Sequence, residues 1–298
     1  MAQSVERFGL SCALATPFDE SGQVEGAKLA AHVQWALSQG CDSVTAFGTT
    51  GEGPSLGIPA RQTILKAIAD SGIDLRQRVL GGVAASSLHE ALDQTAILLD
   101  ADCRAILLAP PFYFKGVSDD GLFAWFSSYF DKLGDRARDV ILYNIPSVTA
   151  VTLSVDLISR LRTAYPQIIT GVKDSSGDWA YTQKLLAAHK DIAILIGDER
   201  HLAQGVRIGA QGAISGMANV CPDRLKPMIT AGQESDQVVR IVEDVLKFPV
   251  TPAVKALVAH RTGDNGWLRV RSPLMALSAA DASRVASAYD AAFASKAA

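Results

Sequence analysis

Short apolar runs alternate with segments of helical periodicity along most of this chain. Eight runs predict strands, at residues 10–17, 43–48, 79–84, 104–110, 140–146, 168–174, 193–198 and 212–216. Between them, apolar residues recur at the three- and four-residue spacing of an amphipathic helix, as in Leu29, Val33 and Leu37. After Pro222 the pattern is helical to the end, with breaks near 248–249 and 262–266.

This alternation predicts an α/β fold. Continuous apolar strands separated by helices favour a parallel sheet that is covered on both faces. Eight consecutive strand–helix units fit a closed (β/α)8 TIM barrel. An open doubly wound sheet is the alternative, but it would normally place a glycine fingerprint after the first strand, where this chain has ATPFDESG. We expect the barrel over 1–222, and the last barrel helix with a helical C-terminal extension over 223–298.

Composition narrows the classes of function. The net charge of −3 over 298 residues gives no support for nucleic-acid binding, which usually shows a basic patch. No apolar run approaches the roughly 18 residues of a membrane span, and the first residues lack a signal-peptide pattern. The cysteines are not arranged in CxxC pairs, so buried reduced thiols in a cytoplasmic protein are expected. They are Cys12, Cys41, Cys103 and Cys221.

The histidines predict no metal site. They fall mostly in expected helices and show neither HxH nor HExxH spacing, so scattered core or surface histidines are the preferred interpretation. Their positions are His32, His89, His189, His201 and His260. A metal-dependent barrel enzyme stays open through the acidic pair Asp198 and Glu199, although a charged turn or a contact with substrate hydroxyls is preferred there.

Candidate chemistry gathers at one end of the expected barrel. Active sites of such barrels lie at the carboxyl ends of the strands. The second strand ends at GTTGEG, the fourth at APPFYF, the fifth at Tyr143 and Asn144, the seventh at GDE and the eighth at ISG. The sixth strand carries Lys173 near its end. Hydroxyls, tyrosines and one lysine are therefore expected on the same rim.

Lys173 ends a strand that looks buried, in the sequence GVKDSSG. Burial disfavours the charged form of an amine, and a neutral amine is a nucleophile for ketones and aldehydes. Its imine with a 2-keto acid would stabilise a carbanion beside the former carbonyl. Tyr143 on the neighbouring strand could shuttle the protons, with Thr49, Thr50 and Tyr113 as a hydroxyl relay. A snorkelling lysine, or an ion pair with Asp174, is the structural alternative.

Two of these features also have plain structural interpretations. Tyr143 taken alone fits a buried tyrosine whose hydroxyl has a hydrogen-bond partner. The GTTGEG segment fits a tight turn with a helix cap, or an anion site in which backbone N–H groups and hydroxyls bind a carboxylate. It is not a phosphate loop, because no GK[ST] follows.

Six short motifs, in this order at successive strand ends, resemble one family. They are GTTGE at 48–52, PPFYF at 110–114, YNIP at 143–146, GVKD at 171–174, GDE at 197–199 and GAISGMANV at 212–220. Together they resemble the pyruvate-dependent class I aldolases and lyases typified by dihydrodipicolinate synthase and N-acetylneuraminate lyase. The resemblance covers nearly the whole chain.

The resemblance implies a mechanism and an assembly. Lys173 would form the Schiff base with pyruvate or a related 2-keto acid, and no other cofactor would be needed. Tyr143 would be the general acid/base, in a relay with Thr49 and with Tyr113. In the family that second tyrosine crosses into a neighbouring subunit, which implies a homodimer, usually paired into a homotetramer. Thr49 and Thr50 would bind the pyruvate carboxylate. Gly48 and the carbonyl of Ile214 would line the pocket.

Departures from the family pattern bear on the second substrate. True dihydrodipicolinate synthases carry an arginine for the carboxylate of aspartate semialdehyde where this chain has Val148. A valine cannot make that bidentate contact. Asp174, after the lysine, is more similar to the 2-keto-3-deoxy-sugar-acid and 4-hydroxy-2-oxoglutarate aldolase branches. The acceptor pocket is expected to involve Ser147, Val148, Ser175, Glu199 and Ser215.

The favoured function is therefore a 2-keto acid aldolase that makes or breaks a C–C bond with pyruvate as one partner. Besides the metal-dependent enzyme, three alternatives stay open at this point. They are a dihydrodipicolinate synthase, a dehydratase of deoxy-keto-sugar acids that uses the same imine, and a non-catalytic 2-keto acid binding protein.

Overall fold

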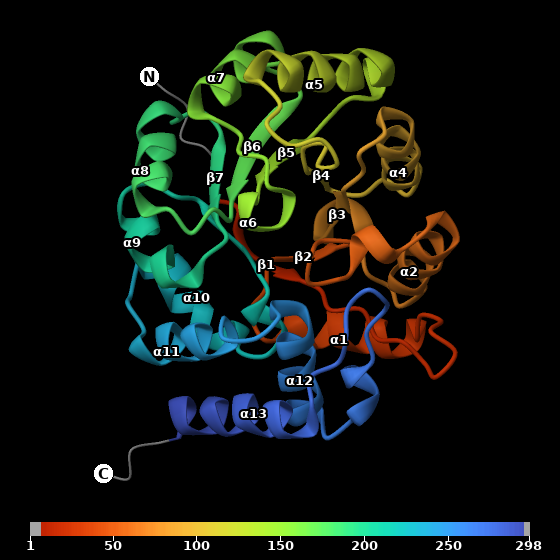
Figure 1. Cartoon of the computed structure of the whole chain (residues 1–298), viewed down its shortest axis with the longest axis vertical. Coiled ribbons are helices and arrows are strands. Elements are labelled where there is room, and N and C mark those ends of the chain that lie inside the picture. The colour runs from red at the N-terminus through yellow and green to blue at the C-terminus, as the bar shows by residue number, and fades with distance from the viewer. Residues whose placement is uncertain (1–6, 295–298) are drawn as a thin grey trace.

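The barrel predicted from the alternating pattern is confirmed. The computed structural model describes residues 7–294 (Figure 1). Its sheet is a closed barrel of eight parallel strands in chain order, in which β8 pairs with β1. The strands are β1 (Gly9–Ala13), β2 (Ser43–Ala46), β3 (Val79–Val83), β4 (Ala105–Leu108), β5 (Val140–Asn144), β6 (Ile169–Asp174), β7 (Ala193–Ile196) and β8 (Gly212–Ser215). This is a (β/α)8 TIM barrel.

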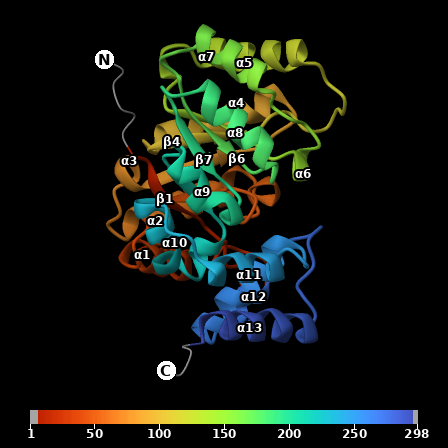
Figure 2. The same ribbon diagram turned by 90° about the vertical axis from the view of Figure 1, so that its left-hand side faces the viewer.

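Helices surround the barrel and extend the chain beyond it. The ring contains α1 (Gly26–Ser38), α2 (Ile58–Asp70), α3 (Leu75–Arg78), α4 (Leu88–Asp100), α5 (Asp119–Leu133), α6 (Pro146–Thr149), α7 (Val155–Ala164), α8 (Trp179–Ala188), α9 (Leu202–Arg207) and α10 (Pro222–Ala231). It is followed by α11 (Asp236–Val245), α12 (Val250–Thr262) and α13 (Ala279–Phe293). Figure 2 shows these last three helices stacked on one side of the barrel.

Side-chain caps determine where many of the helices begin. A serine or aspartate before the first turn accepts a hydrogen bond from a backbone N–H of that turn, which would otherwise have no partner inside the helix. Seven helices, α3, α4, α5, α7, α8, α11 and α13, begin in this way. Their capping residues are Asp74, Ser87, Ser118, Ser154, Asp178, Ser235 and Ser278.

Most of the strands end earlier than their apolar runs predict. Strand β2 was expected to reach residue 48, but it ends at Ala46 because Phe47 takes a left-handed backbone conformation with φ of 61°. Gly53 allows the loop to fold back, since a Cβ there would lie 1.8 Å from the carbonyl oxygen of Phe47. The loop that follows β2 is therefore held tightly against the strand end.

Alternation along the strands divides the core into two parts. One set of side chains fills the barrel, including Leu107, Ile141, Tyr143 and Leu195. Their neighbours, such as Val172, pack outward against the helices in a second and larger cluster. Lys173 follows the outward-facing Val172 directly, so alternation along β6 places it in the inward-facing set. No helix among residues 7–294 is long and apolar enough to cross a membrane.

Asn219 ties the end of the barrel back to its beginning. Its Nδ2 donates to the carbonyl oxygens of Ala13 and Gly216 at 2.7 Å each. Its Oδ1 accepts from the backbone N–H of Ala15 and from His32 Nε2, each at 2.9 Å. His32 is thereby held as the Nε2–H tautomer, and its Nδ1 lies 3.3 Å from a guanidinium nitrogen of Arg261.

His32 makes the stability of the fold depend on pH. Burial lowers the pKa of His32 to about 4, against the opposing effect of Asn219, and Arg261 lowers it further. In the unfolded chain His32 therefore binds a proton near pH 6.5, whereas in the folded chain it binds one only near pH 4. As pH falls through this window, the free energy of unfolding should fall by about 3 kcal/mol from this group. Denaturant unfolding at a series of pH values should show that His32→Gln lacks this component, and an unchanged dependence would contradict the assignment.

Candidate active site

Lys173 and Tyr143 lie side by side inside the carboxyl end of the barrel. They occupy the same register position on the neighbouring strands β6 and β5, so both side chains point inward. Lys173 Nζ donates to Tyr143 Oη at 3.3 Å and lies 4.4 Å from the centre of the phenol ring. Each residue is only 6% exposed. The predicted pair of amine and phenol is thus in hydrogen-bond contact in a largely dry environment.

The structure excludes the ion pair between Lys173 and Asp174 that the sequence left open. Asp174 is buried and faces the other side of β6. Its Oδ1 accepts from the side chain of Asn144 and from the backbone N–H of Ser176, both at 3.0 Å, and its Oδ2 accepts from Thr182 at 2.6 Å. The carboxylate of Asp174 therefore packs between strand and helix and does not line the cavity over Lys173.

A cavity of about 320 Å³ opens over the lysine. Most of the residues predicted for the site line it together: Thr49, Thr50, Tyr143, Val148, Lys173, Ser175, Glu199 and Ile214. The helical extension supplies an apolar wall from α11 and α12, which the sequence did not indicate. That wall contains Val242, Val245, Leu246, Val250 and Val254.

A second cavity of about 170 Å³ lies on the other side of Tyr143. Gly48 lines this cavity with Phe112, whereas Thr49 and Val148 line both cavities. The structure therefore places Gly48 beside the phenol and away from the lysine cavity. Ser215, which was expected in the pocket, reaches it through a neighbour: its hydroxyl donates to Glu199 Oε1 at 2.5 Å.

Glu199 is the buried carboxylate at this site, and Asp198 beside it is paired with Arg200. Glu199 begins a short 3-10 turn, Glu199–His201, which is separated from the end of β7 by two residues. Burial raises the pKa of Glu199, although the hydrogen bond from Ser215 and the charge of Lys173 lower it. A carboxyl group with a raised pKa can accept or release a proton closer to neutral pH. Glu199 is thus able to contact substrate hydroxyls as acceptor or donor.

Tyr113 does not reach either cavity within one chain. Its side chain is 73% exposed and packs edge-to-face on Phe114, which is 74% exposed. The loop that carries both is tied down at Lys115, whose Nζ donates to the carbonyl oxygens of Phe112 and Thr149. The relay through Tyr113 therefore requires a second copy of the chain.

Two buried cations for which the sequence predicted no role at the site hold the loop after β2 in place. Arg61 on α2 donates to the carbonyl oxygens of Gly53, Leu56 and Gly82 at 2.8 to 3.0 Å. Its guanidinium also lies over the Phe47 ring at 4.8 Å. Burial lowers the pKa of Arg61 to about 10, so it remains charged at neutral pH.

Lys255 on α12 is the second cation. Its Nζ contacts Glu52 Oε1 at 2.7 Å and donates to the carbonyl oxygen of Thr16 at 2.9 Å, and both side chains of the ion pair are completely buried. Thr251, one turn earlier, donates to the carbonyl oxygen of Thr49 at 3.2 Å. Sequence reasoning quoted Glu52 within GTTGEG but missed its partner, which lies 203 residues away along the chain.

Replacing Lys255 with methionine should destabilise the fold and loosen the loop that carries Thr49. Removing one member of a buried ion pair leaves the other charge without a partner, at a cost of about 3–5 kcal/mol. Denaturant unfolding should show this loss. The double variant Glu52→Gln/Lys255→Met should recover part of it, because no isolated charge remains. A single variant as stable as the parent chain would contradict the role assigned to the pair.

Within residues 7–294 there is no group of three or more His, Cys, Asp or Glu side chains able to hold a metal ion. All four cysteines are buried and free.

Comparison with known proteins fits this geometry. The model of the dihydrodipicolinate synthetase family matches residues 7–292. The chain belongs to this family. A protein of Chloroflexus aurantiacus named uncharacterized DapA-like lyase is 30% identical over 295 residues, which cover 96% of this chain and 97% of that protein. Membership of the dihydrodipicolinate synthetase family makes this chain a lyase of the class I aldolase type.

Two solved structures of family members are also similar. The crystal structure of dihydrodipicolinate synthase from Agrobacterium tumefaciens shares 55% identity with a TM-score of 0.94, covering 96% of this chain and 99% of that one. The chloride-inhibited dihydrodipicolinate synthase from Acinetobacter baumannii, complexed with pyruvate, shares 27% identity with a TM-score of 0.84. That match covers 97% of this chain and 99% of the other.

Proposed function

We propose that this protein forms a Schiff base between Lys173 and pyruvate or a related 2-keto acid, and that it makes or breaks a C–C bond of that acid through the imine. The contact of 3.3 Å between Lys173 Nζ and Tyr143 Oη, beneath the 320 Å³ cavity, is the observation that carries the proposal. The pyruvate complex of the Acinetobacter baumannii relative supports the choice of keto acid.

The first step joins the lysine to the substrate. Lys173 attacks C2 of the keto acid through the lone pair of its amine, and the resulting carbinolamine takes up a proton and loses water to give a protonated imine. Thr49 and Thr50 line the same cavity and, with the carbonyl of Ile214, are the groups that we assign to positioning the carboxylate and C2. The proposal gives the protein no other cofactor.

The imine then accepts an electron pair. In the cleavage direction the C4 hydroxyl loses its proton, the C3–C4 bond breaks and C4 leaves as an aldehyde, while the electron pair forms an enamine. Protonation of C3 and hydrolysis of the imine release pyruvate and restore the amine. Tyr143 is the group in contact with Lys173 Nζ and moves these protons. Thr49 joins it in the proton relay.

Val148 stands at the position where a site for aspartate semialdehyde would need a cation. It lies at the cavity mouth and is 59% exposed, and no arginine stands at this position to bind a second carboxylate. Arg200 also lines the cavity, but its guanidinium is already paired with Asp198 at 2.7 Å. We therefore favour a 2-keto-3-deoxy acid or a 4-hydroxy-2-oxoglutarate type of substrate, whose hydroxyls Ser175 and Glu199 would contact.

Val148→Arg should improve the use of aspartate semialdehyde. A charge-assisted contact with its carboxylate should raise kcat/KM for this acceptor by about tenfold. The assay is a coupled measurement with pyruvate and aspartate semialdehyde, and Val148→Met is the control for side-chain size. If the parent chain already turns over aspartate semialdehyde as fast as a biosynthetic enzyme, the preference for another substrate is wrong.

The proposed function is tested by product analysis with a panel of 2-keto-3-deoxy acids. We expect equal amounts of free pyruvate and an aldehyde from at least one of them. A dehydratase would instead release water and retain the carbon chain. A non-catalytic binding protein would take up pyruvate without forming an imine that borohydride can trap, and either result would overturn the aldolase assignment.

We also propose that a second copy of the chain completes the site. The exposed pair Tyr113 and Phe114 supports a homodimer in which Tyr113 enters the neighbouring cavity, and such dimers would pair into a tetramer. The four buried free thiols support action in the cytoplasm.

A further inference from the structure

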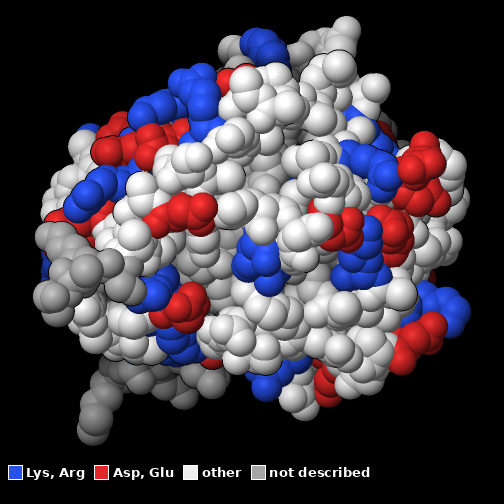
Figure 3. All heavy atoms as spheres, turned by 90° about the horizontal axis from the view of Figure 1, so that it is seen from below, with Lys and Arg blue, Asp and Glu red and all other residues white. Residues whose placement is uncertain are grey.

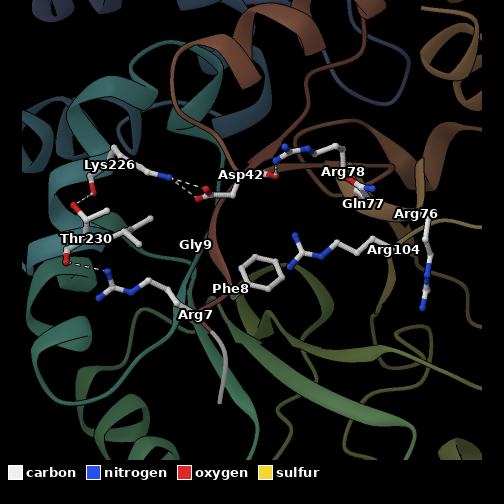
Figure 4. Close-up of a pocket in the computed structure, with 11 residues that line it drawn as sticks. Arg7, Phe8, Gly9, Asp42, Arg76, Gln77, Arg78, Arg104, Lys226 and Thr230 are labelled. Carbon is white, nitrogen blue, oxygen red and sulfur yellow. Dashed lines mark hydrogen bonds and ion pairs between the residues drawn. The ribbon is translucent and has the colours of Figure 1, made fainter. Parts of the chain in front are cut away.

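A third pocket lies at the opposite end of the barrel from Lys173. It encloses about 460 Å³, within the range of about 300–1,000 Å³ that is usual for small-molecule sites. Its lining comes from the amino ends of the first four strands and from α10 (Figure 4). Gly9 begins β1, Asp42 precedes β2, and Arg78 and Arg104 directly precede β3 and β4. We call this the amino-end pocket.

The amino-end pocket carries an excess of positive charge. Its lining contains Arg7, Arg76, Arg78, Arg104 and Lys226, against the single carboxylate of Asp42. The whole chain has a net charge of −3, so this excess is local. On the face seen in Figure 3, by contrast, most basic groups lie next to an acidic group. Gathering like charges costs free energy unless a counter-charge binds there.

Asp42 does not neutralise the other cations of the pocket, because its carboxylate is already paired with Lys226. Lys226 Nζ contacts both of its oxygens, at 2.7 and 2.8 Å, and the backbone N–H of Leu10 donates to Oδ2 at 2.8 Å. Gly9 permits this arrangement, since a Cβ at this position, where φ is +84°, would lie 2.2 Å from Oδ2. The lack of a side chain at Gly9 thus gives Asp42 its place at the centre of the pocket.

Three guanidinium groups of the pocket are held by contacts with carbonyl oxygens or an aromatic ring. Arg78 donates to the carbonyl oxygen of Asp42 at 2.8 Å, and Arg7 donates to that of Thr230 at 2.9 Å. Arg104 lies over the ring of Phe8 at 5.1 Å. Within residues 7–294 none of the three makes an ion pair, whereas Arg76 pairs with Asp139 at 3.0 Å. Carbonyl and aromatic contacts orient a guanidinium and leave its charge uncompensated.

We propose that the amino-end pocket binds a compact polyanion that carries a diphosphate group, either as free diphosphate or as the phosphate chain of a nucleotide. Figure 4 shows Arg78 and Arg104 on one side of Asp42, and Lys226 and Arg7 on the other. A diphosphate presents oxygens in both directions and several negative charges, which matches cations that face one centre from two sides. Guanidinium forks bind phosphoryl oxygens in bidentate fashion. The bound anion would offset the repulsion among Arg7, Arg78 and Arg104.

Isothermal titration calorimetry on the full chain tests this site. Inorganic diphosphate is the probe, orthophosphate and sulfate are the single-centre comparisons, and ADP shows whether the diphosphate is recognised within a nucleotide. We expect one diphosphate per chain, bound more tightly than either single-centre anion and more weakly as salt is added. Arg104→Gln and Arg78→Gln should each weaken it by about tenfold or more.

Arg224→Gln is the matched control, because it removes one positive charge from α10, the helix of Lys226, outside the pocket lining. Circular dichroism checks that each variant is folded, and Arg78, which is exposed, serves if Arg104→Gln does not fold. The site is overturned if no anion binds, if orthophosphate binds as tightly as diphosphate, or if Arg224→Gln weakens binding as much as the pocket variants do.

The proposal for the amino-end pocket rests on different residues from the proposed function at the lysine cavity, so experiments can contradict either one alone. Trapping of the pyruvate imine should be unchanged in Arg78→Gln and Arg104→Gln, because both residues lie at the other end of the barrel. A chain that binds diphosphate but traps no pyruvate would contradict the proposed function alone. A chain that traps pyruvate but binds no diphosphate would contradict the amino-end site alone.

Discussion

Replacing Lys173 with methionine should abolish the exchange of pyruvate methyl protons with solvent. In the account above, exchange requires an imine whose C3 proton leaves as the enamine forms, and only the amine of Lys173 can form that imine in the cavity. Methionine keeps a similar length and fills the same space without a nucleophile. We expect the rate to fall by about four orders of magnitude or more, to the level of the reaction without enzyme. Proton NMR of pyruvate in heavy water measures the rate without knowledge of the second substrate.

The control for this variant is Lys66→Met. Lys66 is an exposed lysine of α2 whose side chain is 75% exposed, so its loss should leave exchange unchanged. Unfolding curves check that Lys173→Met retains the fold, which is expected because the buried amine is replaced by an apolar group of similar volume. Residual exchange near the parent rate in a folded Lys173→Met would remove the lysine from the mechanism.

Tyr143→Phe should separate imine formation from proton transfer. The phenol is the group in hydrogen-bond contact with the lysine amine, at 3.3 Å, and phenylalanine keeps the ring but lacks the hydroxyl. Loss of a positioned acid/base typically slows a reaction by about 10²–10⁴-fold. We therefore expect methyl exchange to fall within this range, while borohydride still traps pyruvate on the chain after long incubation.

Tyr165→Phe is the matched control, since the Tyr165 hydroxyl donates to Asp131 at 3.2 Å near the surface and lies outside the cavity. Both variants remove one hydroxyl and keep the ring. Equal exchange rates in Tyr143→Phe and the parent chain would show that another group moves the proton. A complete failure of Tyr143→Phe to form the imine would instead place the phenol in the first step.

The number and order of the strands could be predicted from the sequence because parallel barrel strands are buried on both faces. Each therefore appears as a short, continuous apolar run between helices. Their ends could not be predicted as well, since apolar residues continue into the loops. Phe47 is buried like a strand residue but has φ of 61°, and Pro110 lies beyond the last residue of β4. The division of the chain at residue 222 stays a prediction.

The pair at the centre of the site could also be predicted, because Lys173 and Tyr143 end neighbouring strands and inward alternation then brings them together. The contacts that hold this pair and its surrounding loops in place could not be predicted. The ion pair of Lys255 and Glu52 joins segments that are distant in the sequence, and no local pattern indicates it. The same is true of the apolar wall from α11 and α12. The side toward which Asp174 points likewise depended on its partners Asn144 and Thr182.

The central claim is that Lys173 carries the substrate covalently. The most direct measurement is mass spectrometry of peptides after the full chain has been treated with pyruvate and borohydride. We predict one reduced pyruvate adduct per chain, on the peptide that contains Lys173, and none in Lys173→Met. A folded chain without any adduct, or with the adduct on a lysine elsewhere, would contradict the account.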